Sequence, residues 1–356
     1  MPSPVISCIP HKQRISRYKI DYLKAITEAL DYPWQTEDGR DVGEIQGSLI
    51  TELNKPYNFK WWFMTNCCTD SLQMAYSVLT KPGDLVLLPA YGWRAIENAP
   101  LYMNRRIELI DVDETGNIDL VKLEERLEDN TQESPSAICL VYNFGCSFDP
   151  SRILSLCQSK DIKVIEDAAP TFLINETADY LPGTGGDITC FSYDFTKNPG
   201  TLGSGGAICC NSDTYGQILT HMTKHYQNSE FSGTKSYLDN TSCAVLLKDV
   251  ELIKRDKLRE KRQDVADYLE QNLKFERIAG NNITNLKFGI KIEGDVSNFV
   301  NYCKKERVLA NTTKYLLKSN HLINTQKFQE SVAFIPCHAF LTDEHVERLE
   351  SIINGY

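Results

Sequence analysis

The sequence has 356 residues, 42% of them hydrophobic, which is enough for two domains with buried cores. Its net charge is −10, and its Lys and Arg residues are scattered along the chain, so we expect no nucleic-acid partner. The N-terminus lacks the basic start and apolar run of a signal peptide, and no apolar segment approaches the length that spans a bilayer. We therefore expect a globular, cytoplasmic protein without a membrane partner.

The cysteine and histidine spacings do not indicate a metal site. Twelve cysteines are spread through predicted strands and helices, which is typical of reduced thiols in a protein core. There is no Cys-x-x-Cys motif. His221 and His225 have helical i, i+4 spacing, but no Glu between them or third ligand nearby completes a zinc pattern. We predict that the protein holds no metal.

The N-terminal part of the chain begins with an amphipathic helix over residues 15–30, whose apolar face is formed by Ile15, Tyr18, Tyr22, Ile26 and Leu30. A polar helix over 43–54 and a strand over 60–64 follow.

The segment 66–71 then turns into a helix that runs through residue 79. Thr69 and Asp70 are good capping residues, and the N–H groups at a helix N-terminus can bind a phosphate. The alternative for this turn is an ordinary capped helix.

Strands and helices alternate in the next part of the chain. Strands are predicted over 85–89, 107–112, 137–144 and 163–167, with helices from about 94, over 119–129 and over 150–159 between them. This alternation predicts a mainly parallel sheet covered on both faces. Tyr91 and Trp93 follow the strand 85–89, where a flat cofactor ring could stack, although plain packing would also explain two aromatic residues there.

The pattern changes after two more apolar strands, over 188–193 and 207–210. Long helices are predicted over 213–229 and 240–273, and then a strand over 287–293, a helix over 296–306, a strand over 331–336 and a capped final helix from 342. We expect a large domain over 1–235, which includes the N-terminal helix, and a long helix with a small α/β domain over 236–356.

Two residues suggest a chemical function. Asp167 ends the strand 163–167, and Lys197 lies in a turn that precedes the glycine-rich segment 200–206. Taken alone, the lysine would be a solvated turn residue and the aspartate a helix cap. Ligands of open α/β sheets bind beyond the carboxyl ends of the strands, so both side chains are expected in one crevice. A lysine that forms a Schiff base and an acid that keeps a pyridine nitrogen protonated are the two groups that pyridoxal phosphate (PLP) chemistry requires.

Seven segments resemble the DegT/StrS-type nucleotide-sugar aminotransferases, which are fold-type I PLP enzymes. The central match is Gly-Thr-Gly-Gly-Asp at 183–187, Phe-Ser-Tyr-Asp-Phe-Thr-Lys at 191–197 and Gly-Ser-Gly-Gly at 203–206. The others are Glu-Asp-Ala-Ala at 166–169, Cys-Thr-Asp-Ser-Leu at 68–72, Pro-Ala-Tyr-Gly-Trp at 89–93, and the segment 334–343. The resemblance extends over nearly the whole length of the chain.

The resemblance implies a three-layer αβα fold with a mainly parallel sheet, a smaller C-terminal α/β domain, PLP as the cofactor, and a homodimer. It makes Lys197 the Schiff-base lysine and Asp167 the partner of the pyridine nitrogen. It also places at the cofactor Cys68 and Thr69 in the phosphate turn, Ser192 as a further phosphate ligand, Trp93 against the ring, and Lys235 as a phosphate contact from the partner subunit. For Lys235 the alternative is an exposed lysine in a loop.

Three departures from the family pattern keep other functions open. Pro170 stands where the family has Gln or His, Cys68 replaces a glycine, and the segment 233–237 matches its counterpart weakly. We predict an enzyme that transfers an amino group from an amino acid, expected to be glutamate, to a keto sugar linked to a nucleotide. The alternatives are a PLP-dependent sugar dehydratase or eliminase, and a non-catalytic regulator that binds PLP or a sugar nucleotide.

Overall fold

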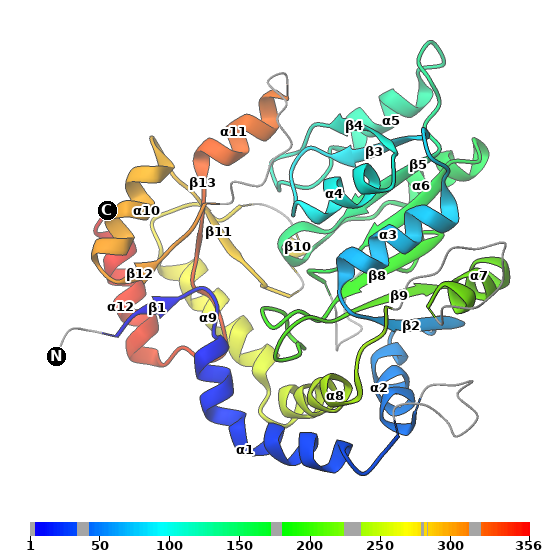
Figure 1. The fold of residues 1–356 in the computed structure, drawn as a ribbon. Helices are drawn as coiled ribbons and strands as arrows, with labels where there is room; N and C mark the ends of the chain where they lie inside the picture. The colour runs from blue at the N-terminus through cyan, green and yellow to red at the C-terminus, as the bar shows by residue number, and fades with distance from the viewer. Residues whose placement is uncertain are drawn as a thin grey trace.

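The computed structural model describes residues 4–33, 43–171, 180–223, 236–278, 281–282, 284–312 and 322–356. Figure 1 shows a large domain built around a central sheet and a smaller domain beside it, and both ends of the chain lie at the smaller domain. The space between the two domains contains the candidate site.

The large domain is organised by a seven-stranded sheet with the order β2-β9-β8-β7-β5-β3-β4. All neighbouring strands pair in parallel except β9, which is antiparallel to both β8 and β2. The strands are β2 (Trp61–Thr65), β3 (Leu85–Pro89), β4 (Arg106–Ile110), β5 (Ala137–Val141), β7 (Lys163–Asp167), β8 (Ile188–Ser192) and β9 (Gly206–Cys210). The central strands are almost continuously apolar because helices cover both faces of the sheet.

Two helical layers enclose this sheet. One core packs the strands against α3 (Cys68–Leu79), α4 (Ala95–Tyr102) and α7 (Asp213–Thr223). On the opposite face, side chains of the sheet pack against α5 (Leu120–Glu128), α6 (Ser151–Ser159), α2 (Glu44–Asn54) and α8 (Asn240–Arg255). The predicted three-layer αβα architecture with a mainly parallel sheet is confirmed.

The smaller domain has its own core of helices and short strands. Strand β11 (Phe288–Lys291) pairs antiparallel with β13 (Val332–Ile335), and β1 (Ile6–Ser7) pairs in parallel with β12 (Val308–Leu309). Its helices are α9 (Leu258–Asn272), α10 (Val296–Lys305), α11 (Ile323–Ser331) and α12 (Asp343–Asn354). The N-terminal strand thus pairs with a strand from the C-terminal part, while the predicted boundary after residue 235 stays a prediction.

Several contacts join the domains. Helix α1 (His11–Ala29) packs along α8, and β10 (Asn281–Asn282) pairs with β6 (Cys146–Ser147), which follows the one-turn 3₁₀ helix η1 (Asn143–Gly145). The residues that line the space between the domains are therefore held from both sides.

The predicted helix over 240–273 is wrong, because the chain breaks between α8 and α9. Lys257 takes a left-handed conformation with φ 51°, and the carboxylate of Asp256 beside it binds Tyr18 and Arg255. The break turns α9 away from α8 and towards the site.

Other boundaries differ by smaller amounts. The buried face of α1 runs through Arg14, Tyr18 and Tyr22, and Arg14 can be buried because it has polar partners. Leu30, which was predicted on the apolar face, is exposed. Strand β5 ends at Val141, before the left-handed Phe144 (φ 63°). Residues 224–229 of the predicted helix over 213–229 lie outside the described residues. Within the described parts of the chain, no helix has the length and apolar character needed to cross a membrane.

Candidate active site

The carboxyl ends of the parallel strands form one edge of the sheet, where the candidate site lies. Strand β7 ends at Asp167 and β8 at Ser192, and β2 ends beside them just before α3 begins. Gly206 starts β9 between these ends, and a Cβ atom there would lie only 2.6 Å from the backbone nitrogen of Cys68. Glycine is therefore required at this position for the N-terminus of α3 to approach the edge of the sheet.

Asp167 is the buried acid of the site. Its side chain is 5% exposed, its Oδ1 atom accepts a hydrogen bond from the Ala169 N–H at 3.0 Å, and the Cys68 thiol lies 3.9 Å from the same oxygen. Burial raises the pKa of Asp167, and the positive charge of Lys197 opposes this rise. A cation placed against this carboxylate would therefore stabilise its ionised form.

Lys197 lies in the loop between β8 and β9, and its side chain enters the site. Burial lowers the pKa of its amine, while the charges of Asp167 and Cys68 act in the opposite direction. A lysine whose pKa is lowered by burial has more of the neutral amine, which is the nucleophilic form. Lys197 and Asp167 each shift the pKa of the other, which agrees with the sequence prediction that they meet at one edge of the sheet.

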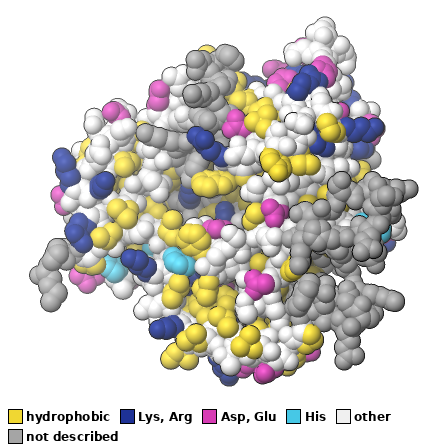
Figure 2. Space-filling model, viewed as in Figure 1, with side chains coloured by type: hydrophobic (Ala, Val, Ile, Leu, Met, Phe, Trp, Pro, Cys, Tyr) yellow, Lys and Arg dark blue, Asp and Glu magenta, His cyan; other side chains and the backbone are white. Residues whose placement is uncertain are grey.

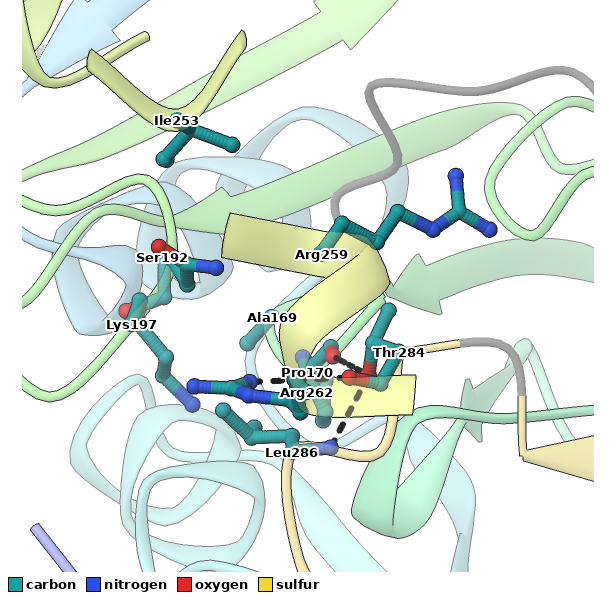
Figure 3. Close-up of a pocket in the computed structure, with 10 residues that line it drawn as sticks. Ala169, Pro170, Ser192, Lys197, Ile253, Arg259, Arg262, Thr284 and Leu286 are labelled. Atoms are coloured by element: carbon teal, nitrogen blue, oxygen red, sulfur yellow. Dashed lines mark hydrogen bonds between the residues drawn. The ribbon is translucent and has the colours of Figure 1, made fainter. Parts of the chain in front are cut away.

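The pocket around Lys197 takes residues from both domains. Its lining is Ala169, Pro170, Ser192, Lys197 and Asn198 from the large domain and Ile253, Arg259, Arg262, Thr284 and Leu286 from the segments after it. Figure 3 shows these side chains around a common space, and Figure 2 shows a hollow between the domains with Lys or Arg side chains in it. The hydroxyl of Thr284 donates a hydrogen bond to the carbonyl of Pro170 at 3.1 Å, which joins the two sides of the pocket.

A buried arginine from α1 holds the loop that carries Lys197. Arg14 donates hydrogen bonds to the backbone carbonyls of Lys197 (3.1 Å), Phe195 (3.1 Å) and Thr201 (2.9 Å). It also forms an ion pair of 3.4 Å with Asp249 of α8. The Asp249 carboxylate accepts a hydrogen bond from the Gly200 N–H at 3.0 Å and another from the Tyr22 hydroxyl. The loop is therefore fixed from two helices.

Glu166, the neighbour of Asp167 on β7, serves a different purpose. It is fully buried, and its carboxylate accepts hydrogen bonds from the hydroxyls of Tyr142 and Tyr180 (2.8 Å for Tyr180). The same carboxylate accepts bonds from the N–H groups of Gly183, Gly185 and Gly186 at 3.2, 2.9 and 2.7 Å. Five donors around one carboxylate hold the chain in the conformation that leads into β8.

The other predicted site residues lie at different distances from this centre. Thr69 is in the first turn of α3, next to Cys68, and the helix has no side-chain N-cap, so the expected capping by Thr69 and Asp70 is wrong. Asp70 instead accepts a hydrogen bond from the Ser236 hydroxyl at 2.7 Å. Ser192 lines the pocket.

Trp93 and Lys235 are predicted cofactor contacts whose roles the structure does not test. Trp93 follows β3 and is 62% exposed. Lys235 lies outside the described residues. The roles predicted for these two residues stay predictions.

The described residues contain no group of three or more His, Cys, Asp or Glu side chains that could hold a metal ion. His225, one of the two histidines considered in the sequence, lies outside this part of the chain.

The comparisons with known proteins identify the family of this chain. The DegT/DnrJ/EryC1/StrS aminotransferase family matches residues 18–288. A curated relative, the UDP-4-amino-4,6-dideoxy-N-acetyl-beta-L-altrosamine transaminase of Campylobacter jejuni, is 28% identical over 266 residues, covering 73% of this chain and 68% of its own length.

Solved structures show the same fold. The crystal structure of S. venezuelae DesV has a TM-score of 0.85 at 18% identity and covers 99% of this chain and 98% of its own. The structure of NtdA from Bacillus subtilis, with the bound cofactor PMP, has a TM-score of 0.78 at 20% identity, and the match covers 94% of this chain and 81% of the NtdA chain.

The fold and the site together define a PLP-dependent aminotransferase. The chain belongs to the DegT/DnrJ/EryC1/StrS aminotransferase family, and the predicted fold-type I architecture, enzyme class and cofactor are confirmed.

The residues of this chain are suited to hold PLP. A buried amine and a buried carboxylate influence each other across the site, as a covalently attached pyridine ring requires. Cys68, the first residue of α3, contacts the carboxylate of Asp167, so the N-terminus of this helix lies at the site. The N–H groups of a helix N-terminus can bind a phosphate.

The sequence analysis missed Arg14, Asp249 and Arg262, which all contact the loop or line the pocket. Each occupies a buried position of its helix. The sequence did contain a signal for them, since each charged residue occupies a position on the apolar face of its helix. A charge that is buried in this way needs a partner or a ligand.

Proposed function

We propose that this aminotransferase moves an amino group from an amino acid, expected to be glutamate, to a keto sugar linked to a nucleotide. The observation that carries the proposal is the buried pair of Lys197 and Asp167 at the carboxyl edge of the sheet, with Lys197 also lining a pocket that takes residues from both domains. The named Campylobacter relative, a transaminase of a UDP sugar, supports the substrate class.

Lys197 is proposed to attach the cofactor through a Schiff base and, once displaced by the amino donor, to carry protons. Its lowered pKa supports both tasks, because a neutral amine can attack a carbonyl and accept a proton near neutral pH. The bound cofactor supplies the electron sink of the reaction. Asp167 is proposed to keep the pyridine nitrogen protonated, since its carboxylate is removed from water and lies near the lysine.

The remaining cofactor contacts are proposed from their places around this pair. Cys68 and Thr69, at the start of α3, and Ser192, at the end of β8, are the proposed phosphate contacts. Trp93 is proposed to cover the ring, which requires it to lose some of its present exposure.

A mass-spectrometric experiment tests the assignment of Lys197. The purified protein with PLP should show an absorbance band that borohydride removes, and peptide mapping after reduction should find the pyridoxyl group on Lys197. A label on any other lysine would contradict the site, and Lys261, which is exposed on α9, is the internal control.

An activity assay tests the reaction. With glutamate and a panel of nucleotide keto sugars, an aminotransferase forms one 2-oxoglutarate for each amino sugar. Asp167→Asn should retain PLP and lose most of its turnover, because a neutral amide cannot stabilise a protonated ring nitrogen. A near-normal rate with an unchanged spectrum would contradict this role.

A dehydratase or eliminase is the second candidate function. Pro170 forms part of the pocket wall next to Ala169, and a proline has no N–H to donate at a position where the family has Gln or His. Loss of water from the sugar without formation of an amino sugar would favour this function. A non-catalytic regulator would bind the sugar nucleotide and give neither product.

The homodimer and the role of Lys235 are proposed from the resemblance, and a mixing experiment tests them. Lys235→Glu and Lys197→Ala should each be inactive. After random re-pairing of the two variants, half of the dimers are heterodimers with one intact site of two, so about a quarter of wild-type activity should return. No recovery from a mixture that contains heterodimers would exclude a shared site through Lys235. The cytoplasmic location is likewise a proposal.

A further inference from the structure

Arg262 is a buried cation in the pocket of Lys197, and nothing in the proposed reaction has yet given it a role. It lies on α9, it is 7% exposed, and it lines the pocket together with Lys197 and Ser192. A second, smaller pocket is also lined by both Arg262 and Lys197. In Figure 3 the guanidinium of Arg262 and the amine of Lys197 extend into the same space and point toward each other.

The guanidinium of Arg262 has no acidic partner within the described parts of the chain. Its Nη1 atom makes one long hydrogen bond of 3.5 Å to the carbonyl of Thr284, and its buried Nε atom has no hydrogen-bond partner among the described residues. Burial lowers the pKa of Arg262, and the positive charge of Arg14 adds to this effect. A buried guanidinium is costly to leave unpaired, so an anionic ligand would stabilise this arrangement.

The surroundings make the pocket selective for an anion. Lys287, which follows the pocket residue Leu286, is a third basic residue near the site, and burial together with the charge of Lys197 lowers its pKa to about 8. Leu286 and Ile253 form apolar walls that keep water from screening these charges. The whole protein has a net charge of −10, so this concentration of cations is local to the pocket.

We propose that Arg262 binds the α-carboxylate of the amino donor, an inference that rests on the proposed aminotransferase function. An amino acid carries its carboxylate on the same carbon as its amine. The group that binds the carboxylate must therefore lie in the same pocket as Lys197, as Arg262 does. A guanidinium presents two parallel N–H donors to a carboxylate, and the Nε atom without a partner belongs to that fork. The phosphates of a sugar nucleotide lie a whole sugar ring away from the reacting carbonyl, and they suit Arg262 less well.

The experiment follows the first half-reaction, in which donor is added to the PLP-loaded enzyme without any sugar and the absorbance of the cofactor is recorded. Three donors separate the two carboxylates of glutamate: glutamate itself, 2-aminobutyrate, which has only the α-carboxylate, and 4-aminobutyrate, which has only the distal one. Arg262→Met should raise the half-saturating concentration of glutamate and of 2-aminobutyrate about 100-fold, the range for a lost hydrogen-bonded charge pair. The value for 4-aminobutyrate should change by less than about threefold.

Two further variants keep the test independent of folding. Lys261→Met removes an exposed cation from the neighbouring position of α9, and it should behave as wild type with all three donors. If Arg262→Met does not fold, Arg262→Lys keeps the charge without the fork, and it should give a smaller loss with the same donor pattern. An equal loss with all three donors, or an effect only on the nucleotide sugar in the second half-reaction, would overturn the inference.

Calorimetric binding of glutarate, a dicarboxylate without an amine, separates this inference from the proposed function. Glutarate binding that Arg262→Met abolishes supports a carboxylate site even if no donor reacts. If wild type reacts with glutamate but Arg262→Met binds glutarate and both α-amino acids as wild type does, the inference fails and the aminotransferase function stands.

Discussion

Arg14→Met should destabilise the protein and loosen the loop that carries Lys197. The substitution removes three hydrogen bonds to loop carbonyls and leaves the carboxylate of Asp249, which is fully buried, without its cation. Methionine fills a similar volume, so the loss of stability comes from the missing polar interactions and not from a cavity. The expected effect is on folding and on the retention of PLP together, because the same carbonyls fix the position of Lys197.

The magnitude follows from the burial of both partners. Removing one member of a buried ion pair costs about 3–5 kcal/mol, most of it from the charge left behind. Asp249→Asn should relieve part of this cost, since an amide still accepts the Gly200 N–H bond of 3.0 Å without carrying a charge. The double variant should therefore be about 1–3 kcal/mol more stable than the sum of the two single losses predicts.

The assay is denaturant unfolding followed by fluorescence and circular dichroism, with the release of PLP recorded in parallel. Arg17→Met is the matched control, because Arg17 lies on the same helix and its ion pair with Asp256 is half exposed. Exposed pairs contribute at most about 1 kcal/mol. Two results would refute the conclusion that Arg14 holds the loop of Lys197. One is a loss of unfolding free energy in Arg14→Met no larger than in Arg17→Met, and the other is retention of PLP by Arg14→Met as in wild type.

Three other substitutions test the buried polar groups. Glu166→Gln should lower the free energy of unfolding by about 2–4 kcal/mol, because the amide NH₂ would face backbone N–H donors. The spectrum of bound PLP should stay unchanged, and a shifted spectrum would contradict the separate roles of Glu166 and Asp167. His338 is buried, and burial together with Arg262 lowers its pKa to about 4. The unfolded chain therefore binds a proton that the folded chain does not, stability should fall by roughly 3 kcal/mol between about pH 6.5 and 4, and His338→Gln should flatten this part of the pH profile. Burial would raise the pKa of Asp111, but hydrogen bonds from Lys122 and from the start of α11 outweigh it and lower the pKa to about 2. Stability from Asp111 is present above about pH 3.8 and lost as the pH falls towards 2, and Asp111→Asn should lose about 2 kcal/mol at pH 7 and show no such loss in acid.

Much of the large domain could be predicted because its signals are local. Strand β3 begins and ends with the apolar run over 85–89, since a strand buried on both faces has a continuous apolar sequence. Strand β7 also begins and ends at the predicted residues 163 and 167, although only Val164 and Ile165 in it are apolar. The meeting of Asp167 and Lys197 followed from topology, because the carboxyl ends of parallel strands share one edge.

The break after Asp256 had no local signal. The segment continues the charged helical pattern without Gly or Pro, and Lys257 is held in a left-handed conformation by contacts of Asp256 with α1. This contact joins residues more than 200 positions apart, so the sequence near the break does not record it. The same separation explains why Arg14 and Arg262 were missed, since their partners and their pocket exist only after the domains have packed.

The two neighbouring acids of β7 show how the backbone assigns different tasks to similar side chains. Successive residues of a strand point to opposite faces of the sheet. Ile165 packs with α3 and Val164 with α6, so Asp167 shares the face of α3 and Glu166 the face of α6. Glu166 meets five donors, which complete its hydrogen bonding and leave it no capacity for a ligand. Oδ1 of Asp167 accepts the Ala169 N–H bond and a weak contact from the Cys68 thiol, whereas Oδ2 accepts no hydrogen bond from the described residues. The charge of Lys197 acts on this carboxylate. A shift of one residue in the register of β7 would exchange these environments, and the acid that faces the cofactor would then be a glutamate, one methylene longer.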